Sequence, residues 1–150
     1  MQGRSICILL VIAAAGACYP SQIDRASYRV PQQVNAVIVI ERRPGHAFFA
    51  EYNRRVELNL ETRKLAQADL YFDSGGYSRV NLYRISDSAF LIRDCFESFV
   101  VDTARQTIER DDTRRKEGAF VGSFDVDSSG AWRFISARER AELPTELKGG

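Results

Sequence analysis

Residues 119–135 have the sequence AFVGSFDVDSSGAWRFI, which is the stretch that most clearly indicates the fold. Short runs rich in aromatic and β-branched residues flank residues 127–130 (DSSG), where Asp, Ser and Gly are typical of a tight turn. Trp132 and Phe134 share one face of the second run, because side chains alternate along a strand. The pattern therefore predicts an antiparallel hairpin whose aromatic face anchors the core.

The rest of the chain repeats this pattern of short strands separated by turn residues. Residues 34–40 (VNAVIVI) are almost continuously apolar, as in a strand buried on both faces, and residues 56–60 (VELNL) alternate as in a half-buried strand. About eight such strands, with turns roughly every eight to twelve residues, predict an all-β antiparallel meander forming a small barrel or a sandwich. Ser136 and Glu139 have capping-box spacing, which predicts a short C-terminal helix ending near Pro144.

The N-terminal sequence has the features of an export signal. Residues 5–17 (SICILLVIAAAGA) form an apolar run of signal-peptide length, shorter than the roughly 20 residues of a membrane span. The segment Ala15-Gly16-Ala17-Cys18 resembles the lipobox of bacterial lipoproteins, in which small residues precede a cysteine that is lipidated after cleavage. This resemblance covers that segment alone, and the motifs of the following domain indicate no family. It implies lipidation at Cys18. Because Tyr19 rather than Asp follows, it also implies an outer-membrane location facing the periplasm.

Ordinary cleavage before Cys18, which would give a periplasmic or secreted protein, is the alternative. These features predict four segments: a signal peptide at 1–17, the lipidated cysteine and a tether at 18–33, a β-domain at 34–143, and a flexible tail at 144–150. The chain has 21 basic and 20 acidic residues, and the signal peptide removes Arg4, so the mature chain has no basic excess. We therefore expect no nucleic-acid partner.

The cysteines allow more than one interpretation. Cys7 lies in the predicted signal peptide, so the mature chain keeps Cys18 and Cys95. If Cys18 is acylated, Cys95 is a small buried thiol; if Cys18 is free, the two could form a disulfide in an oxidising compartment. A reactive Cys95 would need a base, and the only imidazole is His46, in a predicted turn. Since no nucleophile-elbow sequence is present, we expect neither residue to be catalytic.

The middle of the chain is rich in aromatic residues. Because alternation must turn some of these side chains outward, Tyr71, Tyr77 and Tyr83 form a candidate binding patch near Gly75-Gly76. The alternative is that these rings fill the interior.

Residues 125–130 (DVDSSG) match the opening of a calcium-binding EF-hand loop, with Asp125, Asp127 and Ser129 as candidate ligands. The closing position is Ser136 rather than Glu, and both flanks are predicted strands, so the cage would be weak. A hairpin turn requires the same residue types, and we favour that interpretation.

Acidic residues scattered through the middle of the chain offer the basis of an alternative function. A pair of them could come within the roughly 5 to 10 Å used in glycoside hydrolysis. The candidates are Asp69, Asp73, Asp94, Glu97 and Asp102.

The sequence thus predicts a lipid-anchored cell-envelope protein whose β-domain is a non-enzymatic binding or structural module without a cofactor. Its expected partners are the membrane, through the anchor, and an envelope protein or peptidoglycan. The alternative is a small secreted hydrolase that uses paired carboxylates on a β scaffold. A pocket containing two close acids, one with a raised pKa, would favour the hydrolase, whereas an exposed aromatic patch would favour the binding module.

Overall fold

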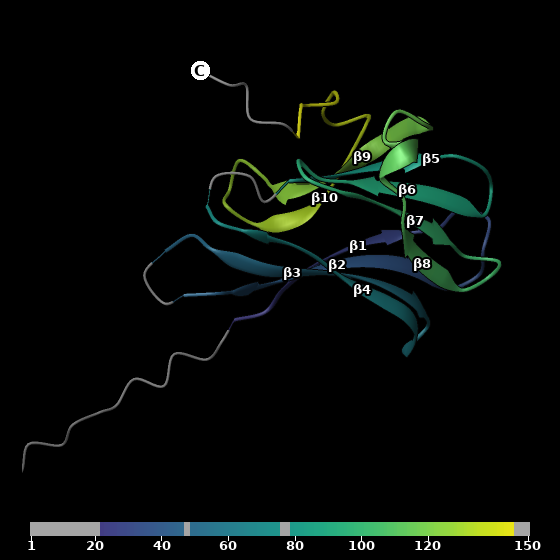
Figure 1. Ribbon diagram of the computed structural model, residues 1–150, viewed down its shortest axis with the longest axis horizontal. Helices are drawn as coiled ribbons and strands as arrows, with labels where there is room; N and C mark the ends of the chain where they lie inside the picture. The colour runs from purple at the N-terminus through teal and green to yellow at the C-terminus, as the bar shows by residue number, and fades with distance from the viewer. Residues whose placement is uncertain (1–21, 47–48, 76–78, 146–150) are drawn as a thin grey trace, which may run out of the picture.

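The computed structural model describes residues 22–46, 49–75 and 79–145. The described residues form two antiparallel sheets that pack face to face (Figure 1). The four-stranded sheet, sheet A, contains β1 (Asp24–Arg29), β2 (Ala36–Pro44), β3 (Tyr52–Leu60) and β4 (Arg63–Asp73) in sequence order. The six-stranded sheet, sheet B, has the order β10 (Trp132–Ser136), β9 (Ala119–Val126), β5 (Val80–Arg84), β6 (Ala89–Arg93), β7 (Ser98–Asp102) and β8 (Thr107–Arg110).

The fold is therefore all-β, as the sequence predicts, and of the two expected architectures it is the sandwich. The predicted hairpin is confirmed, since β9 and β10 pair with Phe124 opposite Phe134 and Val126 opposite Trp132. A short 3₁₀ helix (Asp112–Arg114) connects β8 to β9. No helix in the described residues is long and apolar enough to cross a bilayer.

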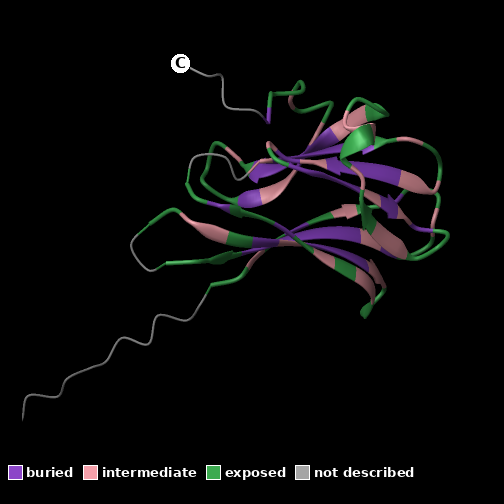
Figure 2. Cartoon of the chain, viewed as in Figure 1, coloured by how far each residue is buried: buried purple, intermediate pink, exposed green. Residues whose placement is uncertain are grey.

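Alternating side chains from both sheets fill one core. Ile38 and Ile40 of β2 point from sheet A toward sheet B, where Phe90 of β6 and Phe124 of β9 are fully buried. Figure 2 shows the buried residues concentrated on the strands and the exposed residues on the connections. Trp132 lies at the edge of this core, and its indole N–H donates to the carbonyl oxygen of Ile40, 3.3 Å away.

The register of sheet A distinguishes the two ends of the sandwich. Asp24, Arg42, Arg54 and Leu70 lie side by side across the four strands, in the row where β1 begins. We call the end beyond this row the proximal end, which lies to the left in Figure 1. Its described connections include residues 45–46, 49–51, 94–97 and 127–131. The opposite, distal end contains the turns at residues 30–35, 61–62, 85–88 and 103–106.

The predicted tether over 18–33 is wrong for its second half. Residues 24–29 form β1, which pairs along its length with β2. The strand is polar on its outer side, whereas its inner side buries Ala26 and packs Tyr28 against the core, so its apolar pattern is only two residues in alternation. The β-domain therefore begins about ten residues earlier than the predicted boundary at residue 34.

The predicted C-terminal helix is also absent from the described residues. The Glu139 carboxylate accepts from the backbone N–H and the hydroxyl of Ser136, which is one half of a capping box, and the chain makes one turn and then runs on without a helix. Side chains of β5 and the residue before it hold this segment, because Asn81 donates to the carbonyl oxygen of Leu143 and Arg79 to that of Pro144. The predicted flexible tail is therefore wrong at its start, where Thr145 is buried. Residues 146–150 lie outside the described residues.

Candidate functional site

Most of the large apolar side chains exposed in the described part of the chain lie at the proximal end. They are Ile23, Phe49, Tyr71, Phe72, Phe96 and Val126. Val34 lies at the distal end, and Leu143 lies near the outer side of sheet B. Exposed apolar side chains that gather in one region are typical of contact surfaces, whereas scattered ones are ordinary.

Two of these residues, Tyr71 and Phe96, form a tilted aromatic pair. Their ring centroids are 4.5 Å apart, and the rings are inclined by 42°. Tyr71 is near the end of β4 in sheet A, and Phe96 is in the β6–β7 loop of sheet B, so the pair bridges the two sheets. The two residues are nonetheless 54% and 51% exposed, which leaves a large part of the pair accessible to a partner.

Asp94 fixes the loop that carries Phe96. One carboxylate oxygen accepts hydrogen bonds from the backbone N–H groups of Phe96 and Glu97, both at 2.8 Å. The other oxygen accepts from Arg54 Nη2 at 2.7 Å, and both side chains of this ion pair are almost completely buried. The same Arg54 nitrogen donates to the carbonyl oxygen of Tyr71, 2.8 Å away. A single buried guanidinium group thus connects the backbone beneath both members of the aromatic pair.

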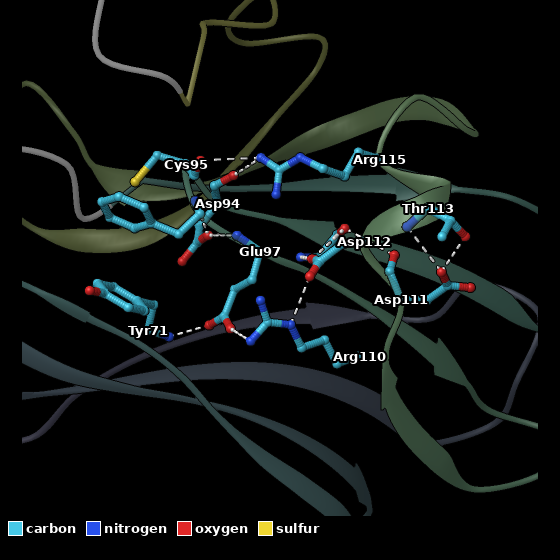
Figure 3. A network of polar contacts seen from close by, with 11 residues as sticks. Tyr71, Asp94, Cys95, Glu97, Arg110, Asp111, Asp112, Thr113 and Arg115 are labelled. Atoms are coloured by element: carbon cyan, nitrogen blue, oxygen red, sulfur yellow. Dashed lines mark hydrogen bonds and ion pairs between the residues drawn. The ribbon is translucent and has the colours of Figure 1, made fainter.

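Glu97 provides a second connection between the sheets. Its carboxylate accepts a hydrogen bond from the backbone N–H of Tyr71 and forms an ion pair with Arg110 of β8 at 3.1 Å. Figure 3 shows Tyr71 and Arg110 approaching this carboxylate from either side. Burial raises the pKa of Glu97, the N–H of Tyr71 opposes that rise, and the nearby charge of Asp94 adds to it. Arg110 also binds Asp112 at 2.8 Å, which lowers the pKa of Asp112.

A second exposed group lies at the tip of sheet A. The ring of Phe72 packs over Gly45, where an added Cβ would lie only 2.8 Å from Phe72 Cε2. Nearby, the His46 and Phe49 rings are 4.9 Å apart, and Phe49 is 63% exposed. Glycine at position 45 therefore lets Phe72 lie close against the end of β2. We call Ile23, Phe49 and Phe72 the apolar tip.

An open recess of about 500 Å³ lies between the start of β1 and the β9–β10 turn. Arg42 is central to its wall, with its guanidinium carbon 4.5 Å from the ring centroids of both Tyr52 and Trp132. Arg42 Nε donates to Asp24 at 2.8 Å, so this cation is already paired. The recess shows that the β9–β10 turn and the start of β1 share the proximal end.

The outer face of sheet A carries a separate charged network. Glu57 is almost completely buried there beneath Arg25, at 2.5 Å, and Lys64. Burial raises the pKa of Glu57, but hydrogen bonding to Lys64 and the charge of Arg25 outweigh it, so the net direction is downward. These contacts cover the carboxylate rather than leaving it open to a ligand.

The predicted tyrosine patch is only partly supported. Tyr71 is exposed, as expected, but Tyr83 is buried, and its hydroxyl donates to Glu142 at 2.6 Å. Burial and this hydrogen bond raise the pKa of Tyr83 well above its usual range. Tyr83 is therefore wrong as a member of a surface patch. Tyr77 and the predicted lipidation site Cys18 lie outside the described residues.

The candidate calcium ligands are occupied by other contacts. Asp127 accepts from the Ser129 hydroxyl at 2.6 Å and from Arg133 at 2.7 Å, and these contacts lower its pKa. Asp125 lies between Arg79 and Arg140, at 2.8 and 2.6 Å. These are the contacts of a hairpin turn and its supporting ion pairs. Within the described residues, no group of three or more His, Cys, Asp or Glu side chains is placed to hold a metal ion.

Of the five acids considered for hydrolysis, Asp69 and Asp102 lie away from the other three. Asp69 is on the outer face of sheet A with Arg55, and Asp102 binds backbone N–H groups of the distal β7–β8 turn. Asp73, Asp94 and Glu97 are buried toward the proximal end. Glu97 has the raised pKa that a general acid would need, but its oxygens and those of Asp94 face guanidinium groups and backbone N–H groups.

Cys95 and His46 add no nucleophilic site. Cys95 forms no disulfide within the described residues and is half-buried, and burial followed by the charge of Asp94 raises the pKa of its thiol, which disfavours the thiolate. His46 is exposed beside Phe49. The residues that sequence reasoning missed are Arg54 and Arg110, because their partners are distant in the chain. Glu97 three residues after Asp94 was the local signal of this arrangement.

Comparisons with protein-family models, with curated proteins and with solved structures find no match to this chain.

Proposed function

We propose that this chain is a lipid-anchored cell-envelope protein whose β-sandwich is a non-enzymatic binding or structural module. The observation that carries the proposal is the half-exposed Tyr71–Phe96 pair held from beneath by the buried Arg54–Asp94 ion pair. Two exposed rings supported by fixed backbone lose little conformational freedom when a partner covers them. Aromatic side chains in such positions supply much of the energy of protein contacts.

The proposed location rests on the N-terminal export signal and the lipobox-like segment that ends at Cys18. Acylation of Cys18 would place the sandwich at a membrane surface, and Tyr19 after it favours the outer membrane, facing the periplasm. The partners expected for the aromatic pair are an envelope protein or peptidoglycan. Equal numbers of basic and acidic residues in the mature chain argue against nucleic acid.

Membrane fractionation tests the anchor. Wild type and Cys95→Ser should both sediment with membranes, whereas Cys18→Ser should move to the soluble fraction, because only Cys18 carries the acyl chains. Cys95→Ser is the matched control for loss of a cysteine. If all three proteins are equally soluble, the chain is not lipid-anchored.

Cosedimentation with purified peptidoglycan sacculi, and crosslinking in cells, test the aromatic pair. The double variant Tyr71→Ser/Phe96→Ser should lose the contact, and Val34→Ser should keep it, since Val34 is an exposed apolar residue at the other end. Equal binding by the two variants would remove the aromatic pair from the proposal.

The hydrolase remains a second candidate because the pKa of Glu97 is raised next to Asp94. Its test is the release of soluble fragments from sacculi by wild type and by Glu97→Gln. We expect no release by wild type, because guanidinium and backbone N–H groups cover both carboxylates. Fragment release that Glu97→Gln abolishes would favour the hydrolase.

A further inference from the structure

The sandwich begins very close to the predicted anchor. Only residues 19–23 separate Cys18 from β1, which begins at Asp24 and is hydrogen-bonded into sheet A. A fully extended chain spans at most about 3.3 to 3.6 Å per residue, so six residues reach about 20 Å. A lipidated Cys18 therefore keeps the proximal end within roughly 20 Å of the lipid headgroups, whereas a 16-residue tether would reach more than twice as far.

The residues at this end are suited to a bilayer surface. Ile23 comes directly before β1, and the register of sheet A places the ends of β2 and β4 at the same end; Phe72 is the second-last residue of β4, and Phe49 lies in the connection after β2. All three side chains of the apolar tip are exposed. Aromatic side chains favour the interfacial region of a membrane, where apolar ring atoms leave water.

The charges at this end are balanced within the protein. Arg42 pairs with Asp24, and Glu41 pairs with both Arg25 and Arg43, at 2.8 to 3.2 Å. Since these cations already have partners in the protein, we expect attraction to anionic headgroups to contribute little to the free energy of membrane contact. Contact would rest on the apolar side chains and should respond weakly to salt.

We propose that the apolar tip lies in the interfacial region of the bilayer that holds the Cys18 anchor. This inference rests on the lipid anchor of the proposed function. The anchor makes the contact intramolecular, so a tip too small to bind vesicles alone is held against the surface by a high effective concentration. The tip fixes the long direction of the sandwich relative to the membrane and leaves the Tyr71–Phe96 pair at the level of the headgroups, open to a partner.

Site-specific photocrosslinking of the full-length chain in bacterial membranes tests this orientation. Benzoylphenylalanine replaces Phe49 in one variant and Val34 in the matched control, because both side chains are strongly exposed and lie at opposite ends. Emission of Trp132, the single tryptophan, reports whether each variant is folded. We expect lipid adducts at position 49 in at least about tenfold excess over position 34, the factor that burial of one aromatic side chain supports.

A second experiment removes the other aromatic ring of the apolar tip, that of Phe72. In the background of the position-49 probe, Phe72→Ser should lower the lipid adducts, and raised salt should change them little. Equal lipid labelling at positions 49 and 34, or no lipid labelling at 49 in membrane-bound protein, would overturn the docking. Protein or glycan adducts in place of lipid at position 49 would overturn it as well and identify a different occupant. Fractionation of the same samples separates these outcomes from failure of the anchor, which would overturn both proposals.

Discussion

At the distal end, three of the described turns contain a non-glycine residue with positive φ: Asn35, Glu61 and Gln106. At the proximal end, the described residues with positive φ are glycines, Gly75 and Gly130. The distal turns are tight, mostly polar, and serve to reverse the strands. The proximal end carries most of the exposed apolar side chains, on strand ends and connections, and contains the buried Arg54–Asp94 pair.

The contrast is the reason that we propose the proximal end as the contact surface. An apolar side chain left in water contributes little to the core, and a buried ion pair is at best a weak source of stability. The proximal end combines both features, so neither is explained by stability alone. Binding surfaces are commonly built this way, on loops held by a rigid scaffold. The predictions below change one end and leave the other as the control.

Loss of the buried charge should have the largest effect. Asp94→Asn removes the negative charge that forms the buried ion pair with Arg54 and should lower the free energy of unfolding by about 3–5 kcal/mol. Urea unfolding followed by Trp132 emission measures the change. Asp69→Asn, which removes the partner of Arg55 on the surface, should cost less than about 1 kcal/mol. Similar costs for the two variants would mean that the Arg54–Asp94 pair does not hold the proximal end.

Removal of the stacked cation should have an intermediate effect. Arg42→Met keeps most of the apolar volume but loses both aromatic contacts and the ion pair with Asp24, which should cost about 1–2 kcal/mol. Arg105→Met is the control at the distal end, where the side chain is exposed and its pair with Asp102 is long, at 3.7 Å. A neutral Arg42→Met would show that the recess wall does not depend on this cation.

A distal turn should become more stable with glycine. Gln106→Gly removes the strain of a left-handed conformation and should raise the free energy of unfolding by up to about 1 kcal/mol. Ala104→Gly in the same turn should not stabilise, because position 104 lacks a positive φ. Destabilisation by Gln106→Gly would contradict the account of the distal turns.

Two acids should give pH dependences of opposite sign. The raised pKa of Glu97 means that the folded state binds more protons, so its contribution to stability falls as pH rises above the ordinary value of 4.5. The lowered pKa of Glu57 means that its contribution is present above 4.5 and is lost as pH falls through the folded value.

The measurement is the free energy of unfolding against pH for wild type, Glu97→Gln and Glu57→Gln. Glu97→Gln should flatten a decline that begins above pH 4.5, and Glu57→Gln should flatten a loss at lower pH. We expect these effects to be smaller than those of the buried ion pair. Exchange of the two signs would show that the environments of Glu97 and Glu57 have been misassigned.

Local patterns predicted the parts of the fold that local chemistry determines. The β9–β10 hairpin depends on a turn sequence and on cross-strand aromatic neighbours, both visible within residues 119–135. β1 was missed because its only buried apolar side chain is Ala26, and an edge strand of this composition resembles a tether. The C-terminal helix was wrong because carbonyl oxygens near Pro144 accept from side chains more than sixty residues away. No local pattern reports such contacts.

The candidate site was predictable to a similar extent. Alternation indicated that some aromatic residues face outward, and Tyr71 does. Alternation alone could not assign Tyr83 to the inside, because that depends on Glu142 and its segment covering the strand. The Arg54–Asp94 pair joins residues 40 positions apart, so only the packing of the two sheets brings them together.

The central claim is that the proximal end is the contact surface of an anchored protein. Amide hydrogen exchange of the full-length chain in its membrane, compared with the unanchored Cys18→Ser chain, tests it most directly. The account predicts slower exchange in the membrane at residues 49–51 and 94–97, with no change at the distal turns 30–35 and 103–106. Protection confined to the distal turns, or equal exchange at both ends in the two samples, would contradict it.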